Sequence, residues 1–272
     1  MGQLDLEDGG RLHYEVVGSG PPLLLVPGLG GRAEFWDPVV PALAARFTVI
    51  LHDHRGTGRS SIERIDYSVA QMTGDVIALL DHLGFDRAHL IGHSTGGAIG
   101  QTLAIDFPER LDRLVLSATW AAADAYFRQF FALRADILRQ AGRAMYLRHG
   151  ALVLSPPWWV RDLPGVAEVS EAAAASQIPD PEVVLARIAA ILRHDRAGDL
   201  HRIAAPTLVI GALDDMVTPA YLSDDLVRAI PGAERLMLAD GGHFFPVTRS
   251  KEFIDAVLRF LDGGAPQAAG AP

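Results

Sequence analysis

The chain has 272 residues, of which 49% are hydrophobic and 21% are charged, so it can bury a substantial core. Its formal net charge of −9 argues against nucleic acid or an anionic membrane surface as a partner, although a locally basic pocket could still bind a small anion. The absence of cysteine excludes disulfides, thiolate chemistry and cysteine-based metal sites. No basic N-terminal segment precedes an apolar run, and no segment looks long enough to span a bilayer, so we expect a cytoplasmic protein.

Short apolar runs predict strands that alternate with helices along most of the chain. A hairpin comes first, because residues 4–7 and 11–17 alternate apolar and polar side chains around a turn at Asp8-Gly9-Gly10. Six further strands are predicted, most of them as the continuous apolar runs of strands buried on both faces: residues 23–26, 47–51, 88–91, 114–116, 206–210 and 235–238. Helical spacing predicts helices over residues 34–45, 69–83, 98–107, 223–230 and 251–261. The alternation predicts an α/β fold with a mainly parallel sheet.

The pattern changes between residues 121 and 196. This segment is rich in alanine and arginine, has helical spacing and contains no convincing buried strand. Its five prolines should divide it into short helices: Pro156, Pro157, Pro164, Pro179 and Pro181. Because ordinary connections are only a few residues long, we interpret it as a helical cap inserted into a core of residues 1–120 and 197–262. Residues 263–272 are rich in glycine, alanine and proline and are predicted to be a disordered tail.

Ser94 stands between a predicted strand and a predicted helix, with Gly92 and Gly96 two residues to either side. A turn this tight brings backbones too close for side chains at the two glycines. It also forces the serine into a strained conformation that lifts its hydroxyl clear of the sheet. The first N–H groups of the following helix can stabilise negative charge at the same point. An ordinary glycine-rich turn is the alternative, but the strand–turn–helix context favours a nucleophile.

A serine hydroxyl needs a base within hydrogen-bond reach, and the base needs a carboxylate to orient it. Among ten histidines, His243 is the best candidate, because it follows two glycines in the loop after the last predicted strand. That loop can bend over the carboxyl end of the sheet, where ligands bind in open α/β folds. The acid is expected in the loop after residues 206–210, where Asp214 and Asp215 both qualify. The loop after the preceding strand offers no carboxylate.

An oxyanion hole is the remaining part of such a site. The glycine-rich segment at residues 27–31 follows a buried strand and can present a free backbone N–H, for which Leu29 is the candidate. The second donor would be the N–H of Thr95, the residue after the proposed nucleophile. A phosphate-cradling loop is the alternative, but no lysine with serine or threonine follows, and the glycine spacing is not that of a dinucleotide-binding loop.

These motifs, occurring together and in this order, resemble the α/β-hydrolase superfamily from about residue 12 to residue 261. The segments that carry the resemblance are residues 27–30, 55–60, 92–97, 215–219 and 241–243. The resemblance implies a mostly parallel eight-stranded sheet flanked by helices, with an inserted helical cap. It also selects Asp215 as the acid, because the acid of the family lies four residues before a proline, here Pro219.

Within the superfamily, the chain is similar to 3-oxoadipate enol-lactonases and to the aminoacrylate hydrolases of pyrimidine degradation. This finer similarity rests on residues 28–31, 55–58, 66–72 and 242–243, the last followed shortly by Val247-Thr248. It implies a serine hydrolase that cleaves a small carboxylate-bearing ester, enol-lactone or enamide-type C–N bond through an acyl-enzyme. No metal or organic cofactor is expected. A serine at the turn argues against haloalkane dehalogenases and epoxide hydrolases, which use aspartate there.

Two other functions stay open on the same scaffold: a ligand receptor or stress-signalling protein with slow turnover, and a cofactor-free haloperoxidase. The expected partner is a small molecule, and the expected state is a monomer or homodimer. The predicted pocket residues are Trp120, Phe127, Arg128, Trp158, Trp159 and Phe244, with core packing as the alternative for the aromatic ones. One or two cap arginines could bind a substrate carboxylate, but the sequence does not choose among Arg128, Arg134, Arg139, Arg143, Arg148 and Arg161.

Overall fold

The computed structural model describes residues 1–162 and 169–263 and contains one eight-stranded sheet, in the order β1-β2-β4-β3-β5-β6-β7-β8. The strands are β1 Gly2–Asp5, β2 Arg11–Val17, β3 Pro22–Val26, β4 Thr48–His52, β5 Ala88–His93, β6 Leu111–Ser117, β7 Thr207–Ala212 and β8 Glu234–Leu238. Strand β2 pairs antiparallel with β1 and β4, and the remaining pairs are parallel. The predicted hairpin and the predicted mainly parallel sheet are therefore confirmed.

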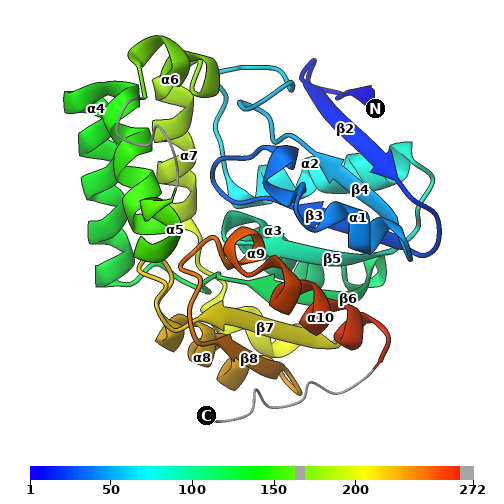
Figure 1. The fold of residues 1–272 in the computed structure, drawn as a ribbon. Coiled ribbons are helices and arrows are strands. Elements are labelled where there is room, and N and C mark those ends of the chain that lie inside the picture. Colours follow the sequence, from blue (N-terminus) through cyan, green and yellow to red (C-terminus); the bar gives the residue numbers. More distant parts are fainter. Residues whose placement is uncertain (163–168, 264–272) are drawn as a thin grey trace.

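Helices cover both faces of the sheet (Figure 1). The elements of the core are η1 Ala33–Trp36, α1 Val40–Ala44, α2 Val69–His82, α3 Thr95–Asp106, η2 Pro108–Arg110, η4 Ala197–Arg202, α8 Ala220–Ala229, α9 Phe245–Thr248 and α10 Ser250–Leu261. Side chains of β3 alternate between the two faces: Leu23 and Leu25 pack with α1 and α10, whereas Leu24 and Val26 pack with α2 and α3. This two-sided burial is why β3 is a continuous apolar run.

The prediction of one continuous helix over residues 34–45 is wrong. The structure has a short 3₁₀ helix, η1, and then the separate helix α1. Pro38 lies between them and has no N–H with which to continue a helix from η1, whereas Pro41 is tolerated because it falls in the first turn of α1. The apolar spacing was therefore real, but Pro38 divides the segment.

The inserted segment folds into helices that lie together at one end of the sheet (Figure 1). They are α4 Ala125–Leu154, α5 Pro157–Arg161, α6 Glu171–Gln177 and α7 Pro181–Arg193. The predicted division at prolines is confirmed for those described: Pro156 and Pro179 lie between helices, and Pro157 and Pro181 begin the helices that follow. Pro164 and residues 264–272, most of the predicted tail, lie outside the described residues.

Helix α4 is interrupted by a glycine. Gly142 has a φ of 81°, in the left-handed region. The chain reverses there, because Arg134 and His149 approach to 3.2 Å, whereas fifteen residues of straight helix would separate them by about 22 Å. The carboxylate of Glu171 accepts the N–H groups of Arg143 and Ala144 at the start of the second half. The cap is thus built on a helical hairpin.

The two ends of the insertion leave the core side by side. Ala122 and Asp195 form an antiparallel bridge, and the N–H of Arg196 donates to the carbonyl of Ala121 at 3.0 Å. The Arg196 guanidinium also binds both carboxylate oxygens of Asp106, at the end of α3. No helix within the described ranges is long and apolar enough to cross a membrane.

Candidate active site

Ser94 occupies the sharp turn between β5 and α3 and has φ 53° and ψ −113°, a backbone conformation that side-chain-bearing residues rarely adopt. Its N–H donates to the carbonyl of Ser117 at 2.8 Å, and the hydroxyl of Thr119 donates to its carbonyl at 2.8 Å. A Cβ on Gly96 would lie 2.0 Å from the carbonyl oxygen of Val26, which leaves no room for a side chain. The surrounding backbone therefore holds the serine in its strained position.

Asp215, in the loop after β7, binds His243, in the loop after β8. Its Oδ1 accepts the N–H groups of Val217 (2.7 Å) and Thr218 (3.0 Å). Its Oδ2 accepts the Thr218 hydroxyl (2.7 Å) and Nδ1–H of His243 (2.8 Å). Because Nδ1 donates to the carboxylate, Nε2 of the neutral imidazole is left as the proton acceptor.

The neighbouring carboxylate makes different contacts. Asp214 accepts the N–H groups of Gly241 (3.2 Å) and Gly242 (2.8 Å), the two residues before His243. Both glycines have positive φ, 128° and 63°, so the loop has a backbone conformation that other residues rarely adopt. Of the two aspartates that the sequence left open, the structure places Asp215 on the imidazole and Asp214 on the backbone that carries it.

His93, the residue before Ser94, packs beneath the site. Its ring stacks on Phe35 with centroids 4.6 Å apart, and its Nδ1 lies 3.1 Å from the hydroxyl of Ser117. Burial, together with the nearby His243, holds the pKa of His93 well below its usual value. His93 is therefore neutral at physiological pH and adds no charge beside the serine.

The segment predicted to supply an oxyanion donor lies against Ser94. The N–H of Gly31 donates to the carbonyl of Gly28 at 2.9 Å and closes a tight turn, and a Cβ on Gly28 would lie 3.2 Å from that of Ser94. Within the described chain, the N–H of Leu29 donates to no backbone or side-chain acceptor, and neither does that of Thr95 in the first turn of α3. Both N–H groups remain available for a ligand.

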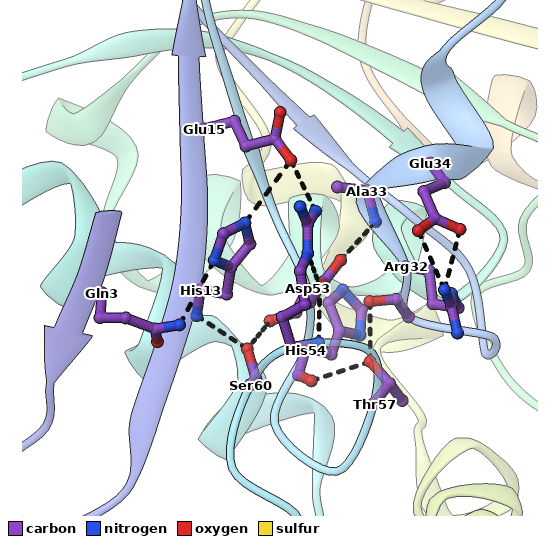
Figure 2. Close-up of polar contacts among 12 residues, drawn as sticks. Gln3, His13, Glu15, Arg32, Ala33, Glu34, Asp53, His54, Thr57 and Ser60 are labelled. Carbon is purple, nitrogen blue, oxygen red and sulfur yellow. Dashed lines mark hydrogen bonds and ion pairs between the residues drawn. The ribbon is translucent and has the colours of Figure 1, made fainter. Parts of the chain in front are cut away.

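A second loop, which follows β4, packs against the turn at residues 27–31 and the residues after it. Figure 2 shows Asp53 accepting the N–H of Ala33 at 2.8 Å, while the Thr57 hydroxyl lies 2.9 Å from the carbonyl oxygens of Gly31 and His54. The N–H of His54 also donates to Gly31, at 2.7 Å. These contacts explain why the glycine-rich segment at residues 55–60 accompanies the turn at residues 27–31 in the sequence.

A cap residue completes the support. Arg187 of α7 is only 1% exposed, and its guanidinium donates to the carbonyls of Leu29 (3.1 Å) and Arg55 (3.0 Å) and to Nδ1 of His54 (2.8 Å). Burial lowers the pKa of Arg187 to about 10, so it stays protonated at neutral pH. Arg187 was not among the residues predicted from the sequence, although it lies four residues from both Val183 and Ile191, on the apolar face of the helix.

A cavity of about 800 Å³ lies between core and cap and includes Ser94 and His243 in its wall. Most of its cap side is apolar: Phe130, Phe131, Leu147, Leu154, Ile178 and Val184. Of the six predicted pocket residues, only Phe244 is among the described residues that line it.

The other five lie elsewhere. Trp120 and Phe127 are fully buried against each other, with ring centroids 4.4 Å apart. Arg128 donates to the carbonyl of Leu192, and Trp158 lies under the guanidinium of Arg249 and beside Trp159. Arg134 of the cap does line the cavity. No cluster of three or more histidine, aspartate or glutamate side chains in the described residues could hold a metal ion.

Comparison with known proteins identifies the family. Residues 21–250 match the family described as alpha/beta hydrolase fold, so the chain belongs to that family and is a hydrolytic enzyme. A relative from Azorhizobium caulinodans, provisionally named carbamate hydrolase RutD, is 40% identical over 249 residues, which is 92% of this chain and 94% of the relative.

Two solved structures show the same fold over nearly their whole length. A hydrolase from Pseudomonas aeruginosa is 33% identical, with a TM-score of 0.85 over 96% of this chain and 97% of the other. The enol-lactonase from Burkholderia xenovorans is 28% identical, with a TM-score of 0.87 over 96% and 100% of the two chains. These similarities bear out the family and the two subgroups that the motifs indicated.

Proposed function

We propose that this enzyme is a serine hydrolase in which Ser94, His243 and Asp215 form the catalytic triad. The observation that carries the proposal is the 2.8 Å bond from Nδ1 of His243 to a fully buried Asp215, in a cavity whose wall also contains the strained Ser94. The free N–H groups of Leu29, which lines the same cavity, and of Thr95, the residue after Ser94, support an oxyanion hole.

The reaction follows from these roles. Nε2 of His243 takes the hydroxyl proton while Oγ of Ser94 forms a bond to the substrate carbonyl carbon, whose oxygen becomes an oxyanion held by Leu29 and Thr95. When this intermediate collapses, the bond to the leaving oxygen or nitrogen breaks, and His243 donates its proton to that atom. A water molecule then gives a proton to His243 and adds to the acyl carbon, and Ser94 leaves with that proton. Asp215 holds the imidazole and stabilises its charged form.

The bond that is cleaved is an ester, an enol-lactone or an enamide-type C–N bond. The names of the relatives support this range, since one is a carbamate hydrolase and another an enol-lactonase. All three bonds join an acyl carbon to an oxygen or nitrogen that needs a proton to leave, which is the task assigned to His243.

Steady-state hydrolysis of para-nitrophenyl acetate tests the triad. Ser94→Ala should abolish turnover, and Asp215→Asn should lower kcat by roughly a thousandfold or more, because the amide would favour the wrong imidazole tautomer. Ser176→Ala, at an exposed serine of α6, is the matched control and should keep wild-type activity. Undiminished turnover by Asp215→Asn would refute the acid assignment.

Ester hydrolysis together with two further measurements separates the competing functions. A single acylation burst without steady turnover, together with ligand-dependent thermal stabilisation, would favour the receptor. Bromination with peroxide and acetate at a rate above ester hydrolysis would favour the haloperoxidase.

A further inference from the structure

Arg134 of α4 is a buried cation in the wall of the active-site cavity. Its side chain is 5% exposed, and it lines the same cavity as Ser94 and His243. It lies in the first half of the α4 hairpin, and Tyr146, His149 and Gly150 of the second half surround it. A cationic group is therefore built into a cap wall that is otherwise mainly apolar.

The contacts of Arg134 satisfy only part of its guanidinium. The group lies over the ring of Tyr146, 4.1 Å from its centroid, and Nη1 is 3.2 Å from Nδ1 of His149. Burial and the charge of Arg134 lower the pKa of His149, so that ring is a neutral acceptor. Among the described residues, Nε and Nη2 of Arg134 have no hydrogen-bond partner, and no carboxylate lies within 4.0 Å.

The other arginines that could face the substrate lack either unused donors or a place in the cavity wall. Arg148, for example, is not among the described residues that line the cavity. Three cap arginines pair with acids: Arg139 with Asp136, Arg143 with Glu171 and Arg161 with Asp162. Arg32 also lines the cavity, on the core side, but it pairs with Glu34. Arg187 is as buried as Arg134, but its donors are used by Leu29, Arg55 and His54. Arg134 thus combines burial, access to the cavity and unused donors.

The unused pair, Nε and Nη2, is the edge of a guanidinium that matches the two oxygens of a carboxylate. The same protein uses this edge elsewhere: Arg64, Arg161 and Arg249 each bind both oxygens of an aspartate through Nε and Nη2. Gly150 lies at the other end of the group, where a Cβ would be 3.4 Å from Nη1 and Nη2.

We infer that Arg134 binds a carboxylate of the substrate, at a distance from the carbonyl that Ser94 attacks. This inference rests on the proposed function. The cavity of about 800 Å³ is large enough for a drug-sized ligand, and residues such as Phe131 and Ile178 line the rest of its cap side. The substrate class is then an ester, lactone or enamide whose scissile carbonyl and carboxylate are separated by an apolar segment. A compound as small as carbamate would leave most of this cavity unused.

Paired substrates test the inference. The para-nitrophenyl hemiesters of glutarate, adipate and suberate are compared with the methyl esters of the same acyl chains, which lack the charge. The wild type should prefer the charged member of at least one pair. Arg134→Gln should lower that preference roughly 30-fold or more, chiefly through KM, because a buried charge loses its partner. Arg134→Lys should restore part of it, since lysine keeps the charge but not the two-pronged geometry.

Arg139→Gln is the matched control, because Arg139 is exposed on the same half of α4 and should leave the preference unchanged. Calorimetry with free adipate gives a readout that needs no turnover: Ser94→Ala should bind adipate, and Ser94→Ala/Arg134→Gln should not. Equal preferences in wild type and Arg134→Gln, with adipate binding retained, would overturn the carboxylate site. Turnover that survives in Ser94→Ala would overturn the proposed function instead. In that case, loss of adipate binding in the double variant would still support a carboxylate site at Arg134.

Discussion

Replacing Arg187 with methionine should reduce catalysis far more than folding. The guanidinium joins the cap to the carbonyl of Leu29, whose own N–H is a proposed oxyanion donor. Without it, the turn at residues 27–31 keeps its contacts to His54 and Thr57 but loses its link to α7. Loss of one oxyanion donor typically costs a hundredfold or more in rate, so we expect kcat to fall about a hundredfold. KM should change much less, because Arg187 does not line the cavity.

Two opposing effects set the loss of stability. Methionine leaves three buried acceptors without a donor, and a hydrogen bond to a charged group contributes about 1.5–3 kcal/mol. In the other direction, burial lowers the pKa of Arg187 from 12.5 to about 10, so removing the charge recovers about 3 kcal/mol. The net loss is roughly 4 kcal/mol, against a typical total of about 5–15 kcal/mol. A protein of ordinary stability would remain mostly folded, so unfolding could not explain the lower kcat.

The assay combines ester hydrolysis with circular dichroism on the same samples, so that kcat is expressed per folded molecule. Arg193→Met is the matched control on the same helix. It removes a side chain that is 56% exposed and contacts Tyr67 and Asp66 rather than the active-site turn. Wild-type kcat in folded Arg187→Met would refute the reasoning, and so would an equal loss in Arg193→Met.

Three further predictions concern other buried residues and the loop that carries His243. Gly96→Ala should lower the free energy of unfolding by about 3 kcal/mol in urea titrations, because its Cβ would lie 2.0 Å from the carbonyl of Val26; unchanged stability would contradict this packing. Burial lowers the pKa values of His52 and His194 from 6.5 to about 4, so their neutral forms give full stability above pH 6.5, and that stability is lost as the pH falls toward 4. At pH 5 the protonation of each histidine should lower the free energy of unfolding by roughly 2 kcal/mol, and His194→Gln should recover about that amount. An unfolding free energy that depends on pH in the same way in His194→Gln and in the wild type would contradict this role of His194. Asp214→Ala should lower kcat about tenfold by loosening the loop of His243, and an effect as large as that of Asp215→Asn would mean that the two roles are wrongly divided.

The buried strands could be predicted because burial on both faces leaves a direct trace in sequence. Leu23 to Val26 are apolar in succession since each face of β3 packs on helices, and the same holds for β7. The turn at Ser94 was equally readable, because neighbouring backbone leaves no room for a side chain at Gly92 or Gly96. The buried strands and the turn at Ser94 could be predicted because each depends on residues that are close together in the sequence.

Features that depend on which residues meet across the fold could not be predicted. The sequence suggested that Trp120 and Phe127 line the pocket, but they pack on each other, since large aromatic side chains fill core and cavity wall alike. The choice among cap arginines required the reversal at Gly142, which brings Arg134 against residues of the second half of α4. Nothing local to Arg134 distinguishes it from Arg139 in the sequence.

The cap is bonded to both halves of the proposed site, which constrains how substrate can reach it. Arg187 of α7 holds the carbonyl of Leu29 on the oxyanion side. At the C-terminal end of α4, the carbonyl of Leu154 accepts the N–H of Phe244, the residue after His243, at 2.9 Å. An outward movement of the whole cap would break both contacts and displace the proposed oxyanion donor and the proposed base together. Substrate access that preserves a competent site must therefore leave α7 and the end of α4 in place.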